Sequence, residues 1–322
     1  MEKKISGFIH KPRIPMIREN IGILIGLALM CIFLSFFSDA FLTTRNLFNI
    51  MRQISVNVFL SCCMTMVILI GGIDLSVGSI IAVSGCLCAG LITNNGLSTV
   101  AAIIVAVFCG TLVGAFNGAV ICLTKIPPFI VTLAMMNVGR GFARIYTKAT
   151  TILVNDPLFS AIGTANMPGG IPVHLIYMAV IIVISWVLLN KTRFGRHIYA
   201  VGNNEMAAKF AGINVRNVKF MVYLITGLFA ACAGILSAAR TFSGQFSVGE
   251  GTEMDAISAV VLGGTSMTGG IGRLSGTIIG CLVIGVLNNG LNLIGIDSSW
   301  QYVVKGFVVL LAVLIDYLKK RN

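Results

Sequence analysis

Charged side chains are scarce in this chain. Only 11% of its 322 residues are charged, 11 residues are acidic, and 57% are hydrophobic. This composition cannot supply the polar surface that a soluble domain of this size needs, so a soluble protein is excluded. The 23 lysines and arginines leave a formal net charge of +12. In so apolar a chain, the excess indicates basic residues held on the cytoplasmic side of a bilayer, and we expect no nucleic-acid partner.

Motifs for nucleotide binding and catalysis are also missing. No Gly-x-x-x-x-Gly-Lys-Ser/Thr occurs, which excludes a Walker-type ATP site, and the glycine-dense stretch 261–276 is better explained as a tight cytoplasmic turn. The three histidines are far from any carboxylate in the sequence. The chain therefore shows no pairing of a nucleophile with a base that would indicate an enzyme. All nine cysteines fall in apolar segments without a suitably spaced histidine. We therefore expect neither a metal nor another cofactor.

Long apolar runs are what the chain has in abundance. They predict an all-α polytopic membrane bundle of about ten transmembrane helices, although the short breaks also fit eight or nine. One transmembrane domain, 21–318, is expected between cytoplasmic tails at 1–20 and 319–322. A cleaved signal is rejected because no Ala-x-Ala-like site follows the first run. The predicted spans are 21–38, 54–71, 77–94, 98–122, 127–146, 173–190, 217–239, 253–267, 276–295 and 300–318.

The lysines and arginines predict the orientation. With the N-terminus inside, most of them fall in cytoplasmic segments, as the positive-inside rule requires. Both termini are therefore expected in the cytoplasm. The remaining basic residues, Arg140 and Lys305 among them, are expected outside or near the outer ends of spans.

Two glycine-spaced segments resemble each other. Gly110-Thr111-Leu112-Val113-Gly114 matches Gly276-Thr277-Ile278-Ile279-Gly280 five spans later, and an odd offset means opposite orientations in the membrane. This arrangement fits an inverted repeat. Glycines four residues apart also occur wherever membrane helices pack closely, so both explanations stay open.

Polar residues inside the spans are candidates for a solute pathway. Uncharged amides offer donors and acceptors without strong binding, although they also join membrane helices to each other. Asp74 lies in a short break between spans, where it should cap the next helix or face water. The candidate pathway residues are Asn57, Asp74, Ser76, Asn117, Asn137, Asn288 and Asn289.

The segments 240–253 and 146–172 are expected to form the longest external loops. Arg240, Gln245 and Glu250 could dock a soluble delivery protein, or the loops could be solvated connectors.

The longest polar interruption, 191–216, is expected to receive force from a partner. Asn203 or Asn204 can cap a short helix, Glu205 suits its first turn, and Gly212 can end it. Met206, Phe210 and Ile213 would form an apolar knob, whereas Ala207, Ala208 and Ala211 leave the surface shallow. An amphipathic helix on the membrane surface is the alternative. The coupling candidates are Asn204, Glu205, Met206, Ala207, Ala208, Phe210, Ala211, Gly212 and Ile213.

Four stretches carry a family resemblance that covers nearly the whole chain. Residues 41–50, 71–79, 201–208 and 255–276 closely resemble the membrane permease subunits of bacterial ABC importers for ribose and related monosaccharides. The resemblance implies a multi-pass protein of the cytoplasmic (inner) membrane, surrounded by lipid, with a fold similar to the vitamin B12 importer class. It also implies a second permease copy, a cytoplasmic ATP-binding subunit, and a periplasmic or lipid-anchored sugar-binding protein. The sugar itself is left open.

We therefore expect a permease that moves a monosaccharide by alternating access, driven by a partner ATPase. The alternative is an ion-coupled secondary transporter of a small polar solute, because broken helices and inverted repeats fit it equally well. The shortage of carboxylates in the middle of spans argues against that alternative.

Overall fold

The computed structural model describes the backbone of residues 16–321, and the side chains of residues 21–314 apart from 298, 309, 312 and 313. Most of the two predicted tails lies outside the described residues. The helices are α1 Met16–Phe37, α2 Thr44–Leu69, α3 Val77–Thr93, α4 Thr99–Leu123, α5 Pro128–Tyr146, α6 Pro157–Thr164, α7 His174–Lys191, α8 Arg193–Asn203, α9 Glu205–Phe210, α10 Val215–Thr241, α11 Thr252–Leu262, α12 Leu274–Leu293 and α13 Ser298–Arg321. The strands are β1 Ile152–Leu153 and β2 Ser243–Gly244, which pair antiparallel.

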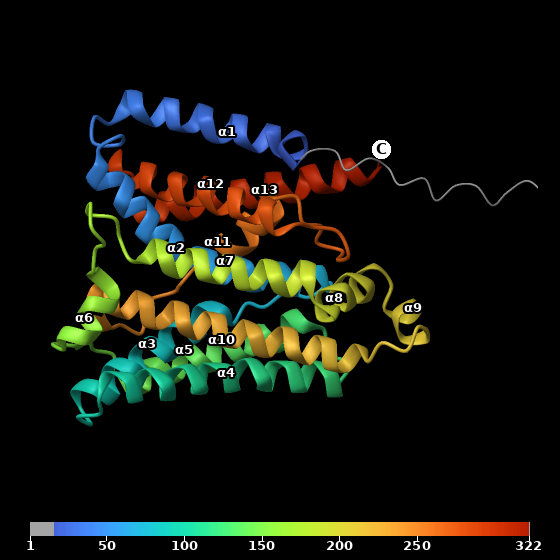
Figure 1. Cartoon of the computed structure of the whole chain (residues 1–322), viewed down its shortest axis with the longest axis horizontal. Coiled ribbons are helices and arrows are strands. Elements are labelled where there is room, and N and C mark those ends of the chain that lie inside the picture. Colours follow the sequence, from blue (N-terminus) through green and yellow to red (C-terminus); the bar gives the residue numbers. More distant parts are fainter. Residues whose placement is uncertain (1–15, 322) are drawn as a thin grey trace, which may run out of the picture.

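Each predicted span contains one helix, so the all-α class is confirmed. Within the described residues, α2, α4, α7, α10 and α12 are long and apolar enough to cross a membrane, while α3 and residues 21–37 of α1 are apolar but shorter. The long helices lie side by side and roughly parallel (Figure 1). Helix α6 lies at one end of the bundle, here called the α6 end, and α8 and α9 lie at the other, the α9 end.

Some helix boundaries differ from the predictions because local chemistry outweighs hydropathy. Helix α2 begins at Thr44 rather than at 54, since the Thr43 hydroxyl accepts the backbone N–H of Asn46 at 3.3 Å and caps a polar first turn. Helix α11 ends at Leu262 instead of 267, where Gly263 and the left-handed Gly264 end it.

The centre of the bundle is organised around α10, which packs against α2, α3 and α4. Small residues make this close approach possible. A Cβ added to Gly227 would lie 2.8 Å from the Cα of Gly114, so the α10 and α4 backbones are nearly in contact. Such contacts replace the hydrophobic drive that lipid does not offer.

Helices α3 and α11 begin inside the bundle, after the non-helical segments 70–76 and 242–251. Helix α3 extends about 24 Å and α11 about 15 Å at 1.5 Å per residue. Their N-terminal regions meet, because the backbones of Gly78 and Gly249 are in contact and leave no room for a side chain on either. Gly249 also has a φ of 78°, which glycine adopts at little cost.

The segment 240–253 is an external loop only in part, since Phe242, Ser247 and Glu250 are exposed but other residues of the segment enter the bundle. Residues of β2 are buried against α3, and the chain then runs between helices to Gly78. Pairing of Ile152 with Gly244 supplies part of the backbone hydrogen bonding that such a buried segment needs.

Candidate functional site

Helix α9 forms as its local sequence predicts. The Asn204 side-chain oxygen accepts the N–H of Ala207 at 2.9 Å, whereas Asn203 instead donates to the Tyr199 carbonyl. Gly212, with a φ of 81°, follows the last turn. Glu205 in the first turn forms an ion pair with Lys219 of α10, with 2.7 Å between Oε2 and Nζ. This pair connects α9 to the start of the long central helix.

The predicted knob on α9 has two exposed members. Phe210 is 84% exposed and Met206 60% exposed, whereas Ile213 is half-buried against the core. Ala208 is buried, and its carbonyl accepts the N–H of Ile213 at 3.0 Å, which closes the C-terminal end of α9. A large apolar side chain left this bare at one end of a membrane bundle is suited to contact with another protein.

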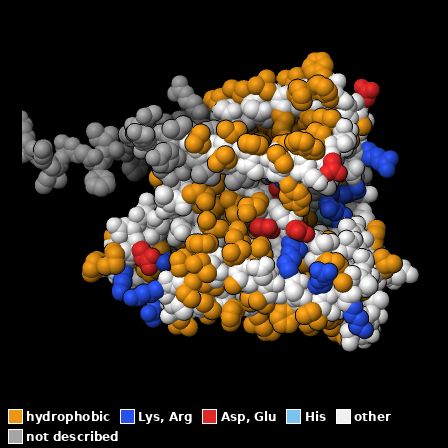
Figure 2. All heavy atoms as spheres, turned by 180° about the vertical axis from the view of Figure 1, so that it is seen from behind, with side chains coloured by type: hydrophobic (Ala, Val, Ile, Leu, Met, Phe, Trp, Pro, Cys, Tyr) orange, Lys and Arg blue, Asp and Glu red, His pale blue; other side chains and the backbone are white. Residues whose placement is uncertain are grey.

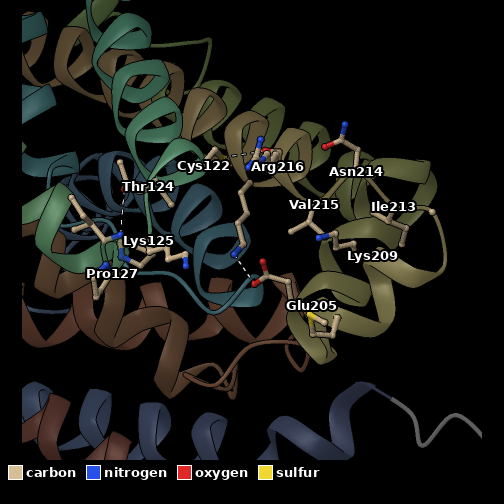
Figure 3. A pocket seen from close by; sticks show the side chains of 16 residues that line it. Cys122, Thr124, Lys125, Pro127, Glu205, Lys209, Ile213, Asn214, Val215 and Arg216 are labelled. Atoms are coloured by element: carbon tan, nitrogen blue, oxygen red, sulfur yellow. Dashed lines mark hydrogen bonds and ion pairs between the residues drawn. The ribbon is translucent and has the colours of Figure 1, made fainter.

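A cavity of about 730 Å³ lies beside α9 (Figure 3). One wall is the α4–α5 connection with Lys125, and the other is formed by α9 and the start of α10, with Lys209 and Arg216. The Glu205–Lys219 pair lies within this lining. The lining therefore carries more basic than acidic side chains, next to the exposed Phe210.

Asp74 neither caps α3 nor faces water, so both expectations for it were wrong. It is fully buried, and its Oδ1 accepts the Ser76 N–H at 2.9 Å and the Ser76 hydroxyl at 2.6 Å. The Asn117 amide donates to the same hydroxyl at 2.9 Å. This chain of hydrogen bonds joins the break before α3 to α4.

The other pathway candidates are spread over the molecule. Asn289 exchanges two hydrogen bonds with Asn46, both at 2.9 Å. Asn288 donates to Asp255, Asn137 is exposed on α5, and Asn57 is half-buried on α2. The seven candidates therefore do not form one site.

Charged residues that the sequence placed near the outer ends of spans lie within the bundle. Arg140 Nη1 of α5 donates to the Val248 carbonyl at 2.7 Å and to the Phe246 carbonyl at 3.2 Å, which satisfies two backbone oxygens of the 242–251 segment. Lys305 of α13 pairs with the buried Asp255 at 3.0 Å. Their only signal in the sequence was a charge inside an apolar run.

A second polar cavity, of about 490 Å³, opens at the α6 end. Its lining includes Arg52 and Arg240 together with several side-chain amides, and it contains no acidic residue. Of the three docking candidates, only Arg240 lines it. Gln245 donates to the Ser243 hydroxyl at 2.9 Å, and Glu250 is exposed.

Asp156 connects two helices at the α6 end. Its Oδ1 accepts the Thr99 hydroxyl at 2.7 Å and the Phe159 N–H at 2.7 Å, so it caps α6 and joins it to the start of α4. The Thr99 hydrogen bond, followed by the backbone N–H, holds the pKa of this carboxyl below its ordinary value.

The bundle has apolar spans, and two of its helices, α3 and α11, begin inside it. Charged groups lie where these two helices meet, at the junction of Gly78 and Gly249. Together these features are typical of a helical membrane transport protein. The profile of the family described as branched-chain amino acid transport system / permease component matches residues 46–313, and the chain belongs to this family. It is 47% identical over 302 residues to the ribose import permease protein RbsC of Bacillus subtilis, covering 93% of each chain. It is 45% identical to RbsC of Escherichia coli K12, over 92% of this chain and 93% of the relative. The D-allose transport system permease protein AlsC of Escherichia coli K12 is 37% identical over 90% of this chain and 89% of its own.

Proposed function

We propose that the chain is the transmembrane permease of an ATP-driven importer for ribose or a related monosaccharide in the bacterial inner membrane. The observation that carries this proposal is the similarity to ribose import permeases along 93% of both chains. The family description names amino-acid transport, but it applies to the family as a whole. Relatives named for ribose and allose match this chain almost from end to end.

Two permease copies would enclose the pathway and alternate between openings to the two sides. The α9 end would face the cytoplasm with both termini, in agreement with the basic residues around the α9 cavity. About ten membrane segments, arranged as in the vitamin B12 importer class, would then be α1–α5, α7 and α10–α13.

An inverted repeat is supported by the order of elements. A long helix, a non-helical segment and a short internal helix follow one another in α2–α3 and again in α10–α11. The short helices pack against α5 and α13 respectively. The two matching glycine segments do not pack against equivalent helices, since Gly114 contacts α10 whereas Gly280 contacts α11.

The ATPase would bind at the α9 end. Phe210 and Met206 would enter an apolar depression on that subunit, while Lys125, Lys209 and Arg216 would attract acidic residues around it. The ion pair from Glu205 to Lys219 would carry a displacement of α9 into α10.

The sugar-binding protein would dock at the α6 end. The cavity with Arg52 and Arg240 has no acidic residue in its lining, so a carboxylate side chain of the binding protein is a fitting occupant. We keep Gln245 as a secondary contact, whereas Glu250 is not retained, because it follows Gly249, which meets Gly78 inside the bundle. Arg240→Gln should weaken docking and flatten its dependence on salt, measured by binding-protein capture on permease in nanodiscs.

Uptake by proteoliposomes that contain the permease, its ATPase and the binding protein tests the function. We expect ribose or a related sugar to accumulate only with ATP and the binding protein, and branched-chain amino acids not to accumulate. Sugar accumulation without the ATPase, or its abolition by an uncoupler while ATP is present, would support the ion-coupled alternative. Accumulation of amino acids instead of sugars would overturn the choice of substrate.

A further inference from the structure

A group of polar side chains on α5 and α13, here called the polar wall, lies away from both ends of the bundle and is not explained by packing. It consists of Asn137 and Arg140 on α5, Tyr302 on α13, and Glu253 at the start of α11. Asn137 is exposed, Tyr302 is 56% exposed, and Arg140 is partly exposed. Arg140 follows Asn137 by three residues, so both lie on one face of α5.

The wall lies at membrane depth. It adjoins the junction of Gly78 and Gly249, from which α3 leads about 24 Å toward the α6 end and α11 about 15 Å the other way. A charged side chain at this depth costs about 2.5–3.5 kcal/mol when it faces lipid, so the exposed part of Arg140 must face water or another protein. Figure 2 shows acidic and basic side chains close together in the middle of one face, with hydrophobic side chains around them.

Part of the hydrogen-bonding capacity of the wall is unused. Arg140 uses Nη1 for two carbonyls, whereas Nη2 has no hydrogen bond among the described residues and lies 3.3 Å from the Cβ position of Gly78. Glu253 is only 8% exposed, contacts the same position, and its Oε2 has no hydrogen-bond partner in the described part of the chain. No ion pair within 4 Å joins the two in that part, although their charges interact electrostatically.

The ring of Tyr302 completes the wall. Its Cε1 lies 3.2 Å from the Cβ position of Gly251, at the start of α11 and two residues before Glu253. An exposed aromatic face beside amide and guanidinium donors is suited to a ring with an apolar face and several hydroxyls.

We propose that Asn137, Arg140 and Tyr302 form a sugar-contacting subsite in the pathway, with Glu253 as a positioning residue that balances the charge of Arg140. The proposal rests on the proposed function and names the residues that carry it out. Asn137 and Arg140 hydrogen-bond sugar hydroxyls, and Tyr302 supports the ring. Such a small set of contacts binds weakly, which lets the sugar leave again.

The test compares exposed residues with matched controls in the complete importer. Asn137→Ala is compared with Asn190→Ala, because both amides are exposed and donate to the carbonyl four residues earlier, at 3.2 Å and 3.0 Å. Tyr302→Leu is compared with Phe307→Leu, since Phe307 on the same helix is 61% exposed. Asn137→Ala and Tyr302→Leu should each lower ATP-driven sugar uptake about threefold to tenfold and leave sugar-independent ATP hydrolysis unchanged. Tyr302→Phe keeps the aromatic ring and should therefore take up sugar like the wild type.

Water access supplies a second readout. Asn137→Cys should react with a membrane-impermeant thiol reagent and be protected by saturating sugar, whereas Phe307→Cys should not react. Uptake by Asn137→Ala and Tyr302→Leu equal to that of their controls, or an unreactive Asn137→Cys, would overturn the subsite. Wild-type importer that takes up no sugar would instead overturn the proposed function, so the two failures are distinguishable.

Discussion

Phe210 offers the sharpest test of coupling to the ATPase. Its side chain is 84% exposed, so nearly all of its apolar surface is free for a partner to cover. Fully burying a phenylalanine side chain contributes about 1.5–3 kcal/mol. Replacement by alanine should therefore weaken ATPase binding by about 2 kcal/mol, or roughly 30-fold in Kd. The fold should be unaffected, because the phenylalanine contributes little to the permease core.

The assay is ATPase binding to the permease in nanodiscs, together with ATP-driven uptake. Phe36→Ala is the matched control, since Phe36 on α1 is 83% exposed but is far in sequence from α9. We expect Phe210→Ala to bind the ATPase weakly and to recover part of its sugar uptake when the ATPase is in excess. Phe210→Asp should bind the ATPase still more weakly and take up less sugar. If Phe210→Ala and Phe36→Ala bind the ATPase equally well, the knob is not the coupling element.

Three further predictions concern the fold. Gly78→Ala should reduce the yield of folded protein because its Cβ meets backbone and side-chain atoms, while Gly306→Ala, with no atom within 4 Å, should not; detergent-stable yield measures this. Lys305→Met should destabilise the fold by about 3–5 kcal/mol because it leaves Asp255 buried without its cation, and Asp255→Leu combined with Lys305→Met should restore much of the thermal stability; equal stability of single and double variants would contradict this. The lowered pKa of Asp156 means that its stabilisation is present above the unfolded pKa of about 3.9 and is lost as pH falls through the folded value, so Asp156→Ala should lower the melting temperature at pH 7 more than at pH 3.

Local rules predicted the α9 region well. Asn204, Glu205 and Gly212 specify the start and end of a short helix through hydrogen bonds and backbone angles that span only a few residues. The apolar runs also located the long helices, because membrane length leaves few alternatives. Helices α6 and α8 were not predicted, since their apolar segments are short.

The junction inside the bundle could not be predicted in the same way. Residues 242–251 look like a solvated loop because they are polar and rich in glycine, and only contact with Gly78 and Arg140 makes them part of the interior. That contact joins residues more than 100 positions apart, as the separation of Arg140 from Val248 records. Asp74 was misjudged for a related reason, since its partner network includes Asn117 on another helix.

Helix α10 connects the features proposed here. It starts beside α9, where Lys219 binds Glu205, and ends with Arg240 in the cavity at the α6 end, about 32 Å from Lys219 along the helix. Gly227 and Gly234 press its backbone against α4 and α3, so α10 cannot slide without moving α3. Because α3 begins at the junction that carries the polar wall, one rigid helix would join the ATPase and the binding protein to the sugar-contacting subsite. Lengthening α10 by one residue near Gly227 would rotate Arg240 by about 100° relative to Lys219 and should uncouple ATP hydrolysis from uptake.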